Sequence, residues 1–475
     1  MYQKLTPKQK ALTINLDPTI YGTFAEIGAG QETVRHFFRA GGASGTIAKA
    51  MSAYDKDFSD AIYGKEVKNR YVTQNRLRKM LRYEVALIEE RISRDNNPDR
   101  KFFSYANTVT TINFDKTVRG HGWVGIRFQT KENEDYNEIV IHVKFKENDA
   151  TLQQETLGNL GVNLIFGAFN YFDNPRTLVE SLYDDIAKDN LEIDMIDFSG
   201  PAFAYVDNRL MSLQLVKNGM TDAVIFNSQG SNMLPADVLY KKNIFAVRGS
   251  FRPVTKVNID MLKNGMDMFF KDAICTHDET EVLIEITISN LRADGDIDER
   301  DFLDRVDILA KLGYTVIISN FSEYYRLIDY FASYTSGDIG VAMGVNNLLM
   351  VFDEKYYKNM SGGILEAFGK FFRNGMRVYL YPYKDPETHQ LLDSSNLKVE
   401  ENLKELYKYF KHNNRIVDIT NYNPEFLEIY SREILRKIAC CVKGWETQVP
   451  EGVAEMIKER GMFGYKEELS LKQFS

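Results

Sequence analysis

The residues best suited to bind a ligand follow predicted strands in the second half of the chain, at the point where each strand ends. They are arginines, serines and asparagines: Arg248, Ser250, Arg252, Asn290, Arg292, Asn320 and Asn346. A guanidinium group binds a phosphate or carboxylate through two parallel hydrogen bonds, and small polar groups at helix starts also suit anions. Serine and asparagine are equally common helix caps, and the arginines have inter-subunit or inter-domain ion pairs as an alternative. We expect these residues to bind a small anionic metabolite.

Two further side chains are candidates for catalysis. Asp197 also follows a predicted strand, and His121 lies in a glycine-flanked turn before Trp123, where a histidine suits a general acid or base. The alternative for His121 is a turn histidine that packs on Trp123. No histidines have i, i+4 spacing and no Cys-x-x-Cys motif is present, so no metal site is predicted. The sequence identifies no cofactor.

A glycine cluster near the amino terminus is a separate candidate. Gly28 and Gly30 follow an apolar strand and precede a helix. The cluster resembles the nucleotide-binding turn of Rossmann-type methyltransferases, in which glycines let the backbone approach a cofactor at the helix start. The alternatives are a close-packed turn and a subunit contact.

Strands alternate with helices from about residue 190 onward. The strands are 193–198, 223–226, 244–247, 282–288, 315–318, 339–343, 377–381 and 416–419. This alternation predicts an α/β fold with a parallel sheet and flanking helices, in which the carboxyl ends of the strands share one edge. Several short helices and the long connection 382–397 favour an open, doubly wound sheet. A barrel-like closed sheet is the second possibility, because the number of strands also suits it.

The earlier part of the chain predicts an α+β region with a β-hairpin formed by residues 122–130 and 138–145. A helix-like run ends at Met51, and long helices are expected at 71–94 and 150–170. We expect four parts along the chain: a mostly helical, glycine-rich unit (1–98), a hairpin and helix unit (99–185), the α/β domain (186–440) and a helix and tail (441–475).

Composition restricts the class of protein. The chain has 475 residues, a net charge of -8 and 44% hydrophobic residues. An acidic chain is not held to nucleic acid by bulk charge, and no run of apolar residues is long enough to cross a membrane. The three cysteines and the lack of a signal-peptide pattern indicate a cytoplasmic protein. The 27 tyrosines and 30 phenylalanines suit a core and the contacts of a homo-oligomer.

Several stretches carry a resemblance over nearly the full length. They are 22–32 (GTFAEIGAGQE), 207–211 (DNRLM), 248–255 (RGSFRPVT), 344–348 (GVNNL) and 362–366 (GGILE). In these stretches the chain resembles a family of bacterial cytosolic proteins without an assigned activity. Members carry the labels nicotinamide-nucleotide adenylyltransferase and outer-membrane receptor. The first label implies two histidines two residues apart, whereas His121 stands alone; the second implies a signal peptide.

Two functions follow as hypotheses. The first is an enzyme or binding protein for a phosphorylated or nucleotide-like metabolite at the strand-end edge. The second is a self-assembling cytosolic scaffold without catalysis, in which the arginines make subunit contacts.

Overall fold

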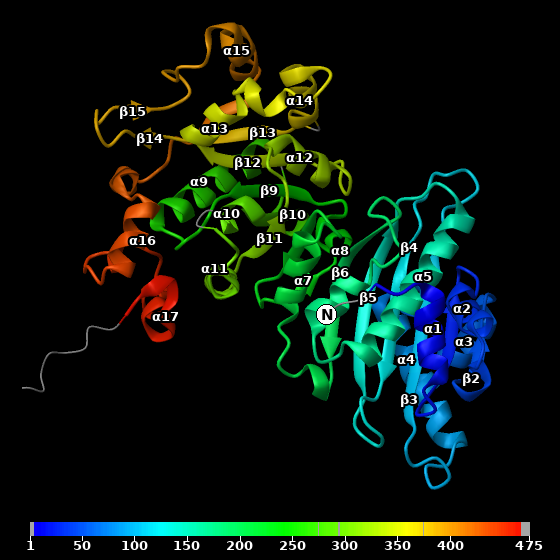
Figure 1. Cartoon of the computed structure of the whole chain (residues 1–475). Helices are drawn as coiled ribbons and strands as arrows, with labels where there is room; N and C mark the ends of the chain where they lie inside the picture. The colour runs from blue at the N-terminus through cyan, green and yellow to red at the C-terminus, as the bar shows by residue number, and fades with distance from the viewer. Residues whose placement is uncertain (1–3, 274, 293–294, 374, 467–475) are drawn as a thin grey trace, which may run out of the picture. The chain divides into compact units, whose positions relative to one another are not determined.

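The computed structural model describes residues 4–273, 275–292, 295–373 and 375–466. It divides into two compact units, which we call unit 1 (Met1–Asp222) and unit 2 (Ala223–Ser475). Each unit contains a sheet with helices on both faces (Figure 1). The predicted α/β class is therefore confirmed. Among the described residues, no helix combines the length and apolar character needed to cross a membrane.

The sheet of unit 1 has six strands in the order β2-β1-β3-β4-β5-β6. The strands are β1 (Ile20–Ile27), β2 (Ile47–Met51), β3 (Lys101–Thr110), β4 (His121–Phe128), β5 (Asn137–Phe145) and β6 (Leu191–Ser199). β1 runs parallel to β2 and β3, and the strands from β3 to β6 are antiparallel. The pair β4–β5 is the predicted hairpin.

Two predictions for this sheet are wrong. The run ending at Met51 is strand β2 and not a helix, because pairing with β1 overrides the helical preference of its alanines and methionine. Residues 193–198 do not begin the parallel sheet of unit 2. They belong to β6, which pairs antiparallel with β5. An apolar alternation predicts a strand, but it does not specify the sheet that the strand joins.

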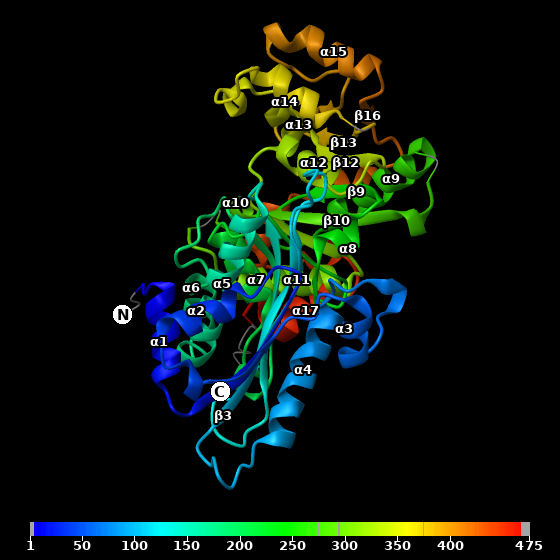
Figure 2. The ribbon, with the colours of Figure 1, turned by 90° about the vertical axis from the view of Figure 1, so that its right-hand side faces the viewer.

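Helices cover both faces of this sheet, as Figure 2 shows. One face carries α1 (Pro7–Leu16), α2 (Glu32–Ala40), α5 (Ala150–Asn170) and α6 (Pro175–Ser181), and α7 (Asn208–Lys217) packs beside β6. The other face carries α3 (Lys56–Tyr63) and α4 (Gln74–Arg91). Phe24, Phe103 and Leu160 are fully buried between the sheet and the first group. Burying whole apolar side chains in this way stabilises each by about 1.5–3 kcal/mol.

The main sheet of unit 2 has the order β16-β13-β12-β9-β10-β11-β7-β8. Its strands are β7 (Ala223–Phe226), β8 (Asn232–Met233), β9 (Asn243–Arg248), β10 (Thr280–Thr287), β11 (Thr315–Ser319), β12 (Ile339–Gly344), β13 (Arg377–Tyr381) and β16 (Ile416–Asp418). The strands from β16 to β11 are parallel, and β7 is antiparallel to β11. The strand order has two ends, so the sheet is open, as the preferred prediction states. The long connection holds a small hairpin, β14 (Tyr383–Lys384) and β15 (Leu391–Leu392).

Helices flank this sheet on both faces, which makes it doubly wound. α9 (Lys256–Ala273) and α11 (Glu299–Lys311) cover one face through ring contacts such as Phe245–Phe269 and Phe226–Phe302. The opposite face carries α8 (Pro235–Leu239), α12 (Tyr324–Ala332), α14 (Gly363–Phe371) and α15 (Lys404–His412). Two short helices, α10 (Ile288–Leu291) and α13 (Val345–Val351), directly follow β10 and β12. The chain continues through α16 (Ser431–Ala439) and α17 (Val453–Arg460).

Candidate functional site

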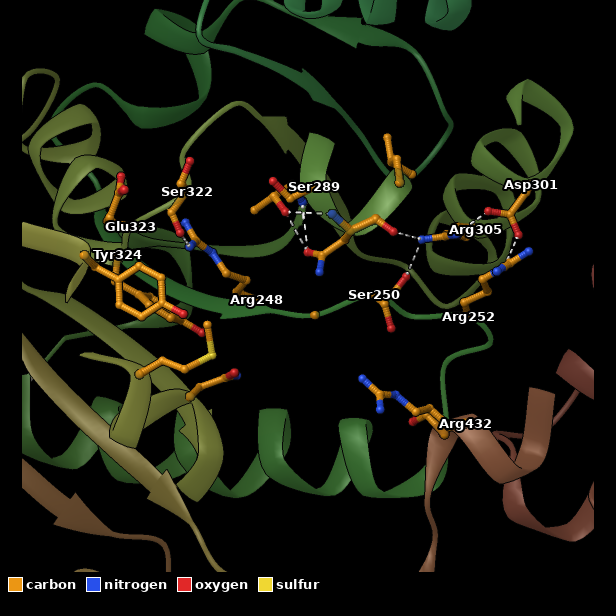
Figure 3. A pocket seen from close by; sticks show the side chains of 18 of the residues that line it. Arg248, Ser250, Arg252, Ser289, Asp301, Arg305, Ser322, Glu323, Tyr324 and Arg432 are labelled. Carbon is orange, nitrogen blue, oxygen red and sulfur yellow. Dashed lines mark hydrogen bonds and ion pairs between the residues drawn. The ribbon is translucent and has the colours of Figure 1, made fainter. Parts of the chain in front are cut away.

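A cavity of about 700 Å³ opens in unit 2 at the carboxyl ends of β9 and β10 (Figure 3). The turns and helix starts after these strands and after β11 form its walls, and α13 and α16 contribute further residues. We call this cavity the strand-end pocket. The carboxyl edge of an open parallel sheet is where such folds bind ligands, and the volume is within the range of small-molecule sites.

The structure brings together four of the seven predicted ligand-binding residues. Arg248, Ser250, Arg252 and Asn290 line the pocket. The other three do not line it: Arg292, Asn320 and Asn346. All three are exposed, and Arg292 caps the carboxyl end of α10.

The direction of side chains around helix α13 explains why Asn346 does not line the pocket. Asn346 lies in the first turn of α13, and the next residue, Asn347, lines the pocket instead. Successive residues of a helix point in directions about 100° apart. The sequence predicts the correct turn there but not the residue of that turn that faces the ligand space.

The turn after β9 is held by a buried ion pair. One edge of the Arg248 guanidinium binds Glu285 of β10, with Nε–Oε2 and Nη2–Oε1 distances of 2.7 and 2.9 Å, and Nη1 donates to the backbone carbonyl of Ser322 at 3.2 Å. Glu285 is fully buried, and the Ser319 hydroxyl donates a third hydrogen bond to its carboxylate at 2.6 Å. Arg248 therefore fixes the position of the turn through a contact within unit 2.

A second set of ion pairs, around Asp301, connects the turn after β9 to the end of β10. Asp301 of α11 binds Nε of Arg252 at 2.6 Å and also forms an ion pair with Arg305. Nη1 of Arg305 donates to the backbone carbonyls of Ser250 and Asn290, at 3.1 and 3.3 Å. Arg305 thus joins two adjacent strand-end turns, which makes this wall of the pocket rigid. Its role was not predicted, because its position in the middle of a helix gave no strand-end signal.

Arg432 lies in the first turn of α16 and extends into the pocket (Figure 3). It is exposed. Among the residues that the structure describes, no carboxylate lies within ion-pair distance of its guanidinium. Arg432 differs in this respect from Arg248 and Arg252, whose charges face buried carboxylates. Sequence reasoning missed it, because the position of α16 against the strand ends depends on tertiary packing.

Tyr324, at the start of α12, forms the opposite wall. Its ring packs against the guanidinium of Arg248, with the Arg248 Cζ atom 4.2 Å from the ring centre. The side chain is 8% exposed, and its hydroxyl has no hydrogen-bond partner within the described chain. Burial raises the pKa of Tyr324, so the phenol stays neutral and can donate a hydrogen bond. Figure 3 shows Tyr324 directed toward the space between Arg248 and Arg432.

Acidic side chains also line the pocket. Asp296, Asp298 and Glu323 are among its lining residues. Within the described ranges, no group of three or more histidine, cysteine, aspartate or glutamate side chains is arranged to hold a metal ion. The pocket therefore combines acidic residues, the paired arginines and the cation of Arg432, which has no carboxylate partner in the described part of the chain.

The glycine turn in unit 1 is a close-packed turn. Gly28 has a φ of +101°, and a Cβ atom there would lie 1.8 Å from the carbonyl oxygen of Val109. Gly30 has a φ of +73° and donates its N–H to the Tyr54 hydroxyl at 2.5 Å. The N–H groups of Thr33 and Val34, in the first turn of α2, donate to the carboxylate of Glu26. Burial raises the pKa of Glu26 to about 7. The helix start at which a cofactor phosphate would bind is thus occupied by a side chain of the protein.

The two catalytic candidates lie in unit 1, apart from the strand-end pocket in sequence and in sheet. Asp197 binds Arg78 at 2.6 Å and accepts a hydrogen bond from Asn208 at 3.0 Å. His121 lies with Nδ1 3.3 Å from Nε2 of His142, and burial lowers the pKa of His121. The ring that packs against Trp123 is that of His142, with ring centres 4.9 Å apart.

Comparisons with known proteins identify no family. No family model matches the sequence, and no curated protein matches it either. Among solved structures, similarity is found to the competence/damage inducible protein CihA from Agrobacterium tumefaciens, with 15% identity and a TM-score of 0.25 over 35% of this chain and 98% of that one. A CinA superfamily protein from Enterobacter cloacae matches with 12% identity and a TM-score of 0.25, over 35% of this chain and 96% of that one. A competence or damage-inducible protein from Enterobacter asburiae gives the same identity and TM-score over 34% of this chain and 95% of that one. We base no functional argument on similarity at this level.

Proposed function

We propose that unit 2 binds a small anionic metabolite, carrying a phosphoryl or carboxylate group, in the strand-end pocket. The observation that carries this proposal is Arg432, a guanidinium that extends into the pocket without a carboxylate partner in the described chain. A guanidinium binds such anions through two hydrogen bonds in one plane.

The surroundings of Arg432 support an anion site. Ser250, Ser289 and Ser322 line the pocket with exposed hydroxyl-bearing side chains. Hydroxyl groups hydrogen bond to phosphate oxygens without adding charge. The ion pairs of Arg248 and Arg252 hold the turn that carries Ser250 in place. A rigid wall reduces the entropy that is lost on binding.

Replacing Arg432 by glutamine is expected to weaken binding of inorganic phosphate and ribose 5-phosphate by about 10- to 100-fold, because a hydrogen bond to a charged group contributes about 1.5–3 kcal/mol. Thermal shift assays with the full chain will find the anions that bind, and isothermal titration calorimetry will give their dissociation constants.

Arg436 provides a matched control for this variant. It lies on the same helix, is also exposed, and does not line the pocket. Arg436→Gln removes the same charge and should leave affinity within about twofold, because long-range attraction between exposed charges is screened by salt. Equal losses in both variants, or no stabilisation of the wild-type protein by any anion, would contradict the proposal.

We propose self-assembly of the chain as the alternative function, and a specific observation favours it. In unit 1, Phe114 is 99% exposed, and Val118 and Leu152 are about half exposed. Apolar side chains of this size are usually covered by a partner when they cluster.

If these side chains form a homo-oligomer contact, Phe114→Ser should lower the mass measured by multi-angle light scattering. A wild-type chain that is monomeric at micromolar concentration would contradict this alternative, and the two functions are compatible.

A further inference from the structure

We infer that the ligand of the strand-end pocket is a nucleoside phosphate, with its phosphate at Arg432 and its neutral ring system at Tyr324. This inference rests on the proposed anion site and adds the second half of the ligand to it. It follows from three features of the pocket that a bare anion leaves unsatisfied.

The first feature is the Tyr324 hydroxyl. It is buried, lines the pocket, and has no partner among the described residues. Buried polar atoms are nearly always hydrogen bonded, so a missing partner in a pocket wall indicates a group that arrives from outside the chain. A phenol both donates and accepts a hydrogen bond, which suits the carbonyl or amino groups of a nucleobase.

The second feature is the charge around that hydroxyl. The adjacent cation, Arg248, already forms a bidentate ion pair with Glu285, and its Nη1 donates to the backbone carbonyl of Ser322. Burial raises the pKa of the Tyr324 phenol. The charge of Arg248 is therefore already balanced by Glu285 and does not favour a second anionic group at this end of the ligand, whereas a neutral polar group would pair with Tyr324.

The third feature is exposed apolar surface inside the pocket. Met350 of α13 is 49% exposed and lines the cavity, together with the half-buried Leu435. A phosphate or a phosphosugar has no apolar surface with which to cover these side chains. A planar base covers them, and the methionine thioether makes favourable contacts with aromatic rings.

The positions of Arg432 and Tyr324 on two walls of the pocket suit one elongated ligand. Arg432 comes from α16 and Tyr324 from α12, and both extend toward the same space (Figure 3). The cavity volume of about 700 Å³ exceeds what a phosphate ion fills. A ligand with a charged end and a neutral ring end uses both walls at once.

The test compares four probes by isothermal titration calorimetry: AMP, UMP, ribose 5-phosphate and inorganic phosphate. AMP or UMP should bind the full chain about tenfold tighter than ribose 5-phosphate, because the base buries apolar surface. Tyr324→Phe should weaken nucleotide binding by about three- to tenfold, the usual contribution of one neutral hydrogen bond. It should leave the affinity for ribose 5-phosphate unchanged.

A control separates this effect from a change in stability. Tyr407 is another buried tyrosine of unit 2, and its hydroxyl donates to the carbonyl of Ser394 at 2.8 Å, outside the pocket. Tyr407→Phe should lower the melting temperature and leave nucleotide affinity unchanged. Tyr324→Phe should weaken nucleotide binding and leave the melting temperature unchanged, because the Tyr324 hydroxyl has no hydrogen-bond partner among the described residues.

The outcomes distinguish this inference from the proposed function. If ribose 5-phosphate binds through Arg432 as tightly as AMP and UMP, or if Tyr324→Phe has no effect on the nucleotides, the inference is wrong and the anion site remains. If none of the four probes binds, both are wrong.

Discussion

Replacing Glu285 by glutamine is expected to lower the free energy of unfolding of unit 2 by about 3–5 kcal/mol, the range for removing one partner of a buried ion pair. Glu285 is fully buried, and the side chain of Arg248 is 9% exposed. The glutamine is nearly isosteric, so the loss reports charge and not packing. Without the carboxylate, the buried guanidinium of Arg248 keeps its desolvation cost and loses its counter-charge.

The two tryptophans of the chain make this measurement specific. Trp445 lies in unit 2 and is 1% exposed, whereas Trp123 lies in unit 1. In a Trp123→Phe background, urea unfolding followed by tryptophan fluorescence reports unit 2 alone. Equilibrium unfolding of each unit can then be treated separately, which a chain with two compact units requires.

A double variant supplies the control. Arg248→Met combined with Glu285→Met removes both charges and should be more stable than Glu285→Gln, because no unpaired charge stays buried. A loss below about 1 kcal/mol in Glu285→Gln would be the value for an exposed ion pair and would contradict this account. A double variant less stable than the single one would also contradict it.

The elements of unit 2 follow closely from local sequence. Residues 244–247, 339–343 and 377–381 read as strands because buried parallel strands are short, continuous apolar runs, and they match β9, β12 and β13. The residues between them that carry helical periodicity form α9, α11, α12 and α14. Local patterns are sufficient here because each strand and its following helix pack against each other.

The sheet that a strand joins is harder to predict from sequence, because it depends on contacts between residues far apart in the chain. The strand at 193–198 carries two aspartates within its apolar pattern, but this does not indicate that it pairs with β5 and not with a strand of unit 2. β2 reaches its place only through parallel pairing with β1. A stretch of about ten residues around either strand does not indicate which strand it pairs with.

The same distinction applies to the strand-end pocket. The rule that ligands bind at the carboxyl edge of a parallel sheet identifies Arg248, Ser250, Arg252 and Asn290 from sequence. It does not reveal that Arg248 and Arg252 face carboxylates from neighbouring elements. Arg432 follows no strand directly, and Tyr324 has the same sequence signal as any aromatic residue in an amphipathic helix. Their positions follow only from tertiary packing.

A charged cluster in unit 1 is expected to contribute as much to the free energy of unfolding as the Arg248–Glu285 ion pair does in unit 2. The carboxylate of Asp194 in β6 binds Nδ1 of His142 at 2.6 Å and Nζ of Lys144 at 2.7 Å. The side chains of Asp194 and His142 are almost completely buried. Burial alone would raise the pKa of Asp194, but the charges of His142 and Lys144 outweigh it and hold that pKa below its ordinary value. Ionised Asp194 therefore stabilises the folded state.

Asp194→Asn is expected to lower the free energy of unfolding of unit 1 by about 3–5 kcal/mol at pH 7. The sign of the pH dependence follows from the depressed pKa. The stabilisation is fully present above the unfolded pKa of about 3.9 and is lost as the pH falls below it toward the folded pKa. Urea unfolding at several pH values, in a Trp445→Phe background, measures this through Trp123, whose ring contacts His142.

Asp189→Asn serves as the matched control, because Asp189 is an exposed aspartate of unit 1. It should change the free energy of unfolding by less than about 0.5 kcal/mol, as surface substitutions usually do. The difference in stability between the wild-type protein and Asp194→Asn should shrink between about pH 4 and pH 2. A difference that stays constant down to pH 2 would mean that packing, and not the charge of Asp194, causes the loss. The depressed pKa would then have no part in the stability of this unit.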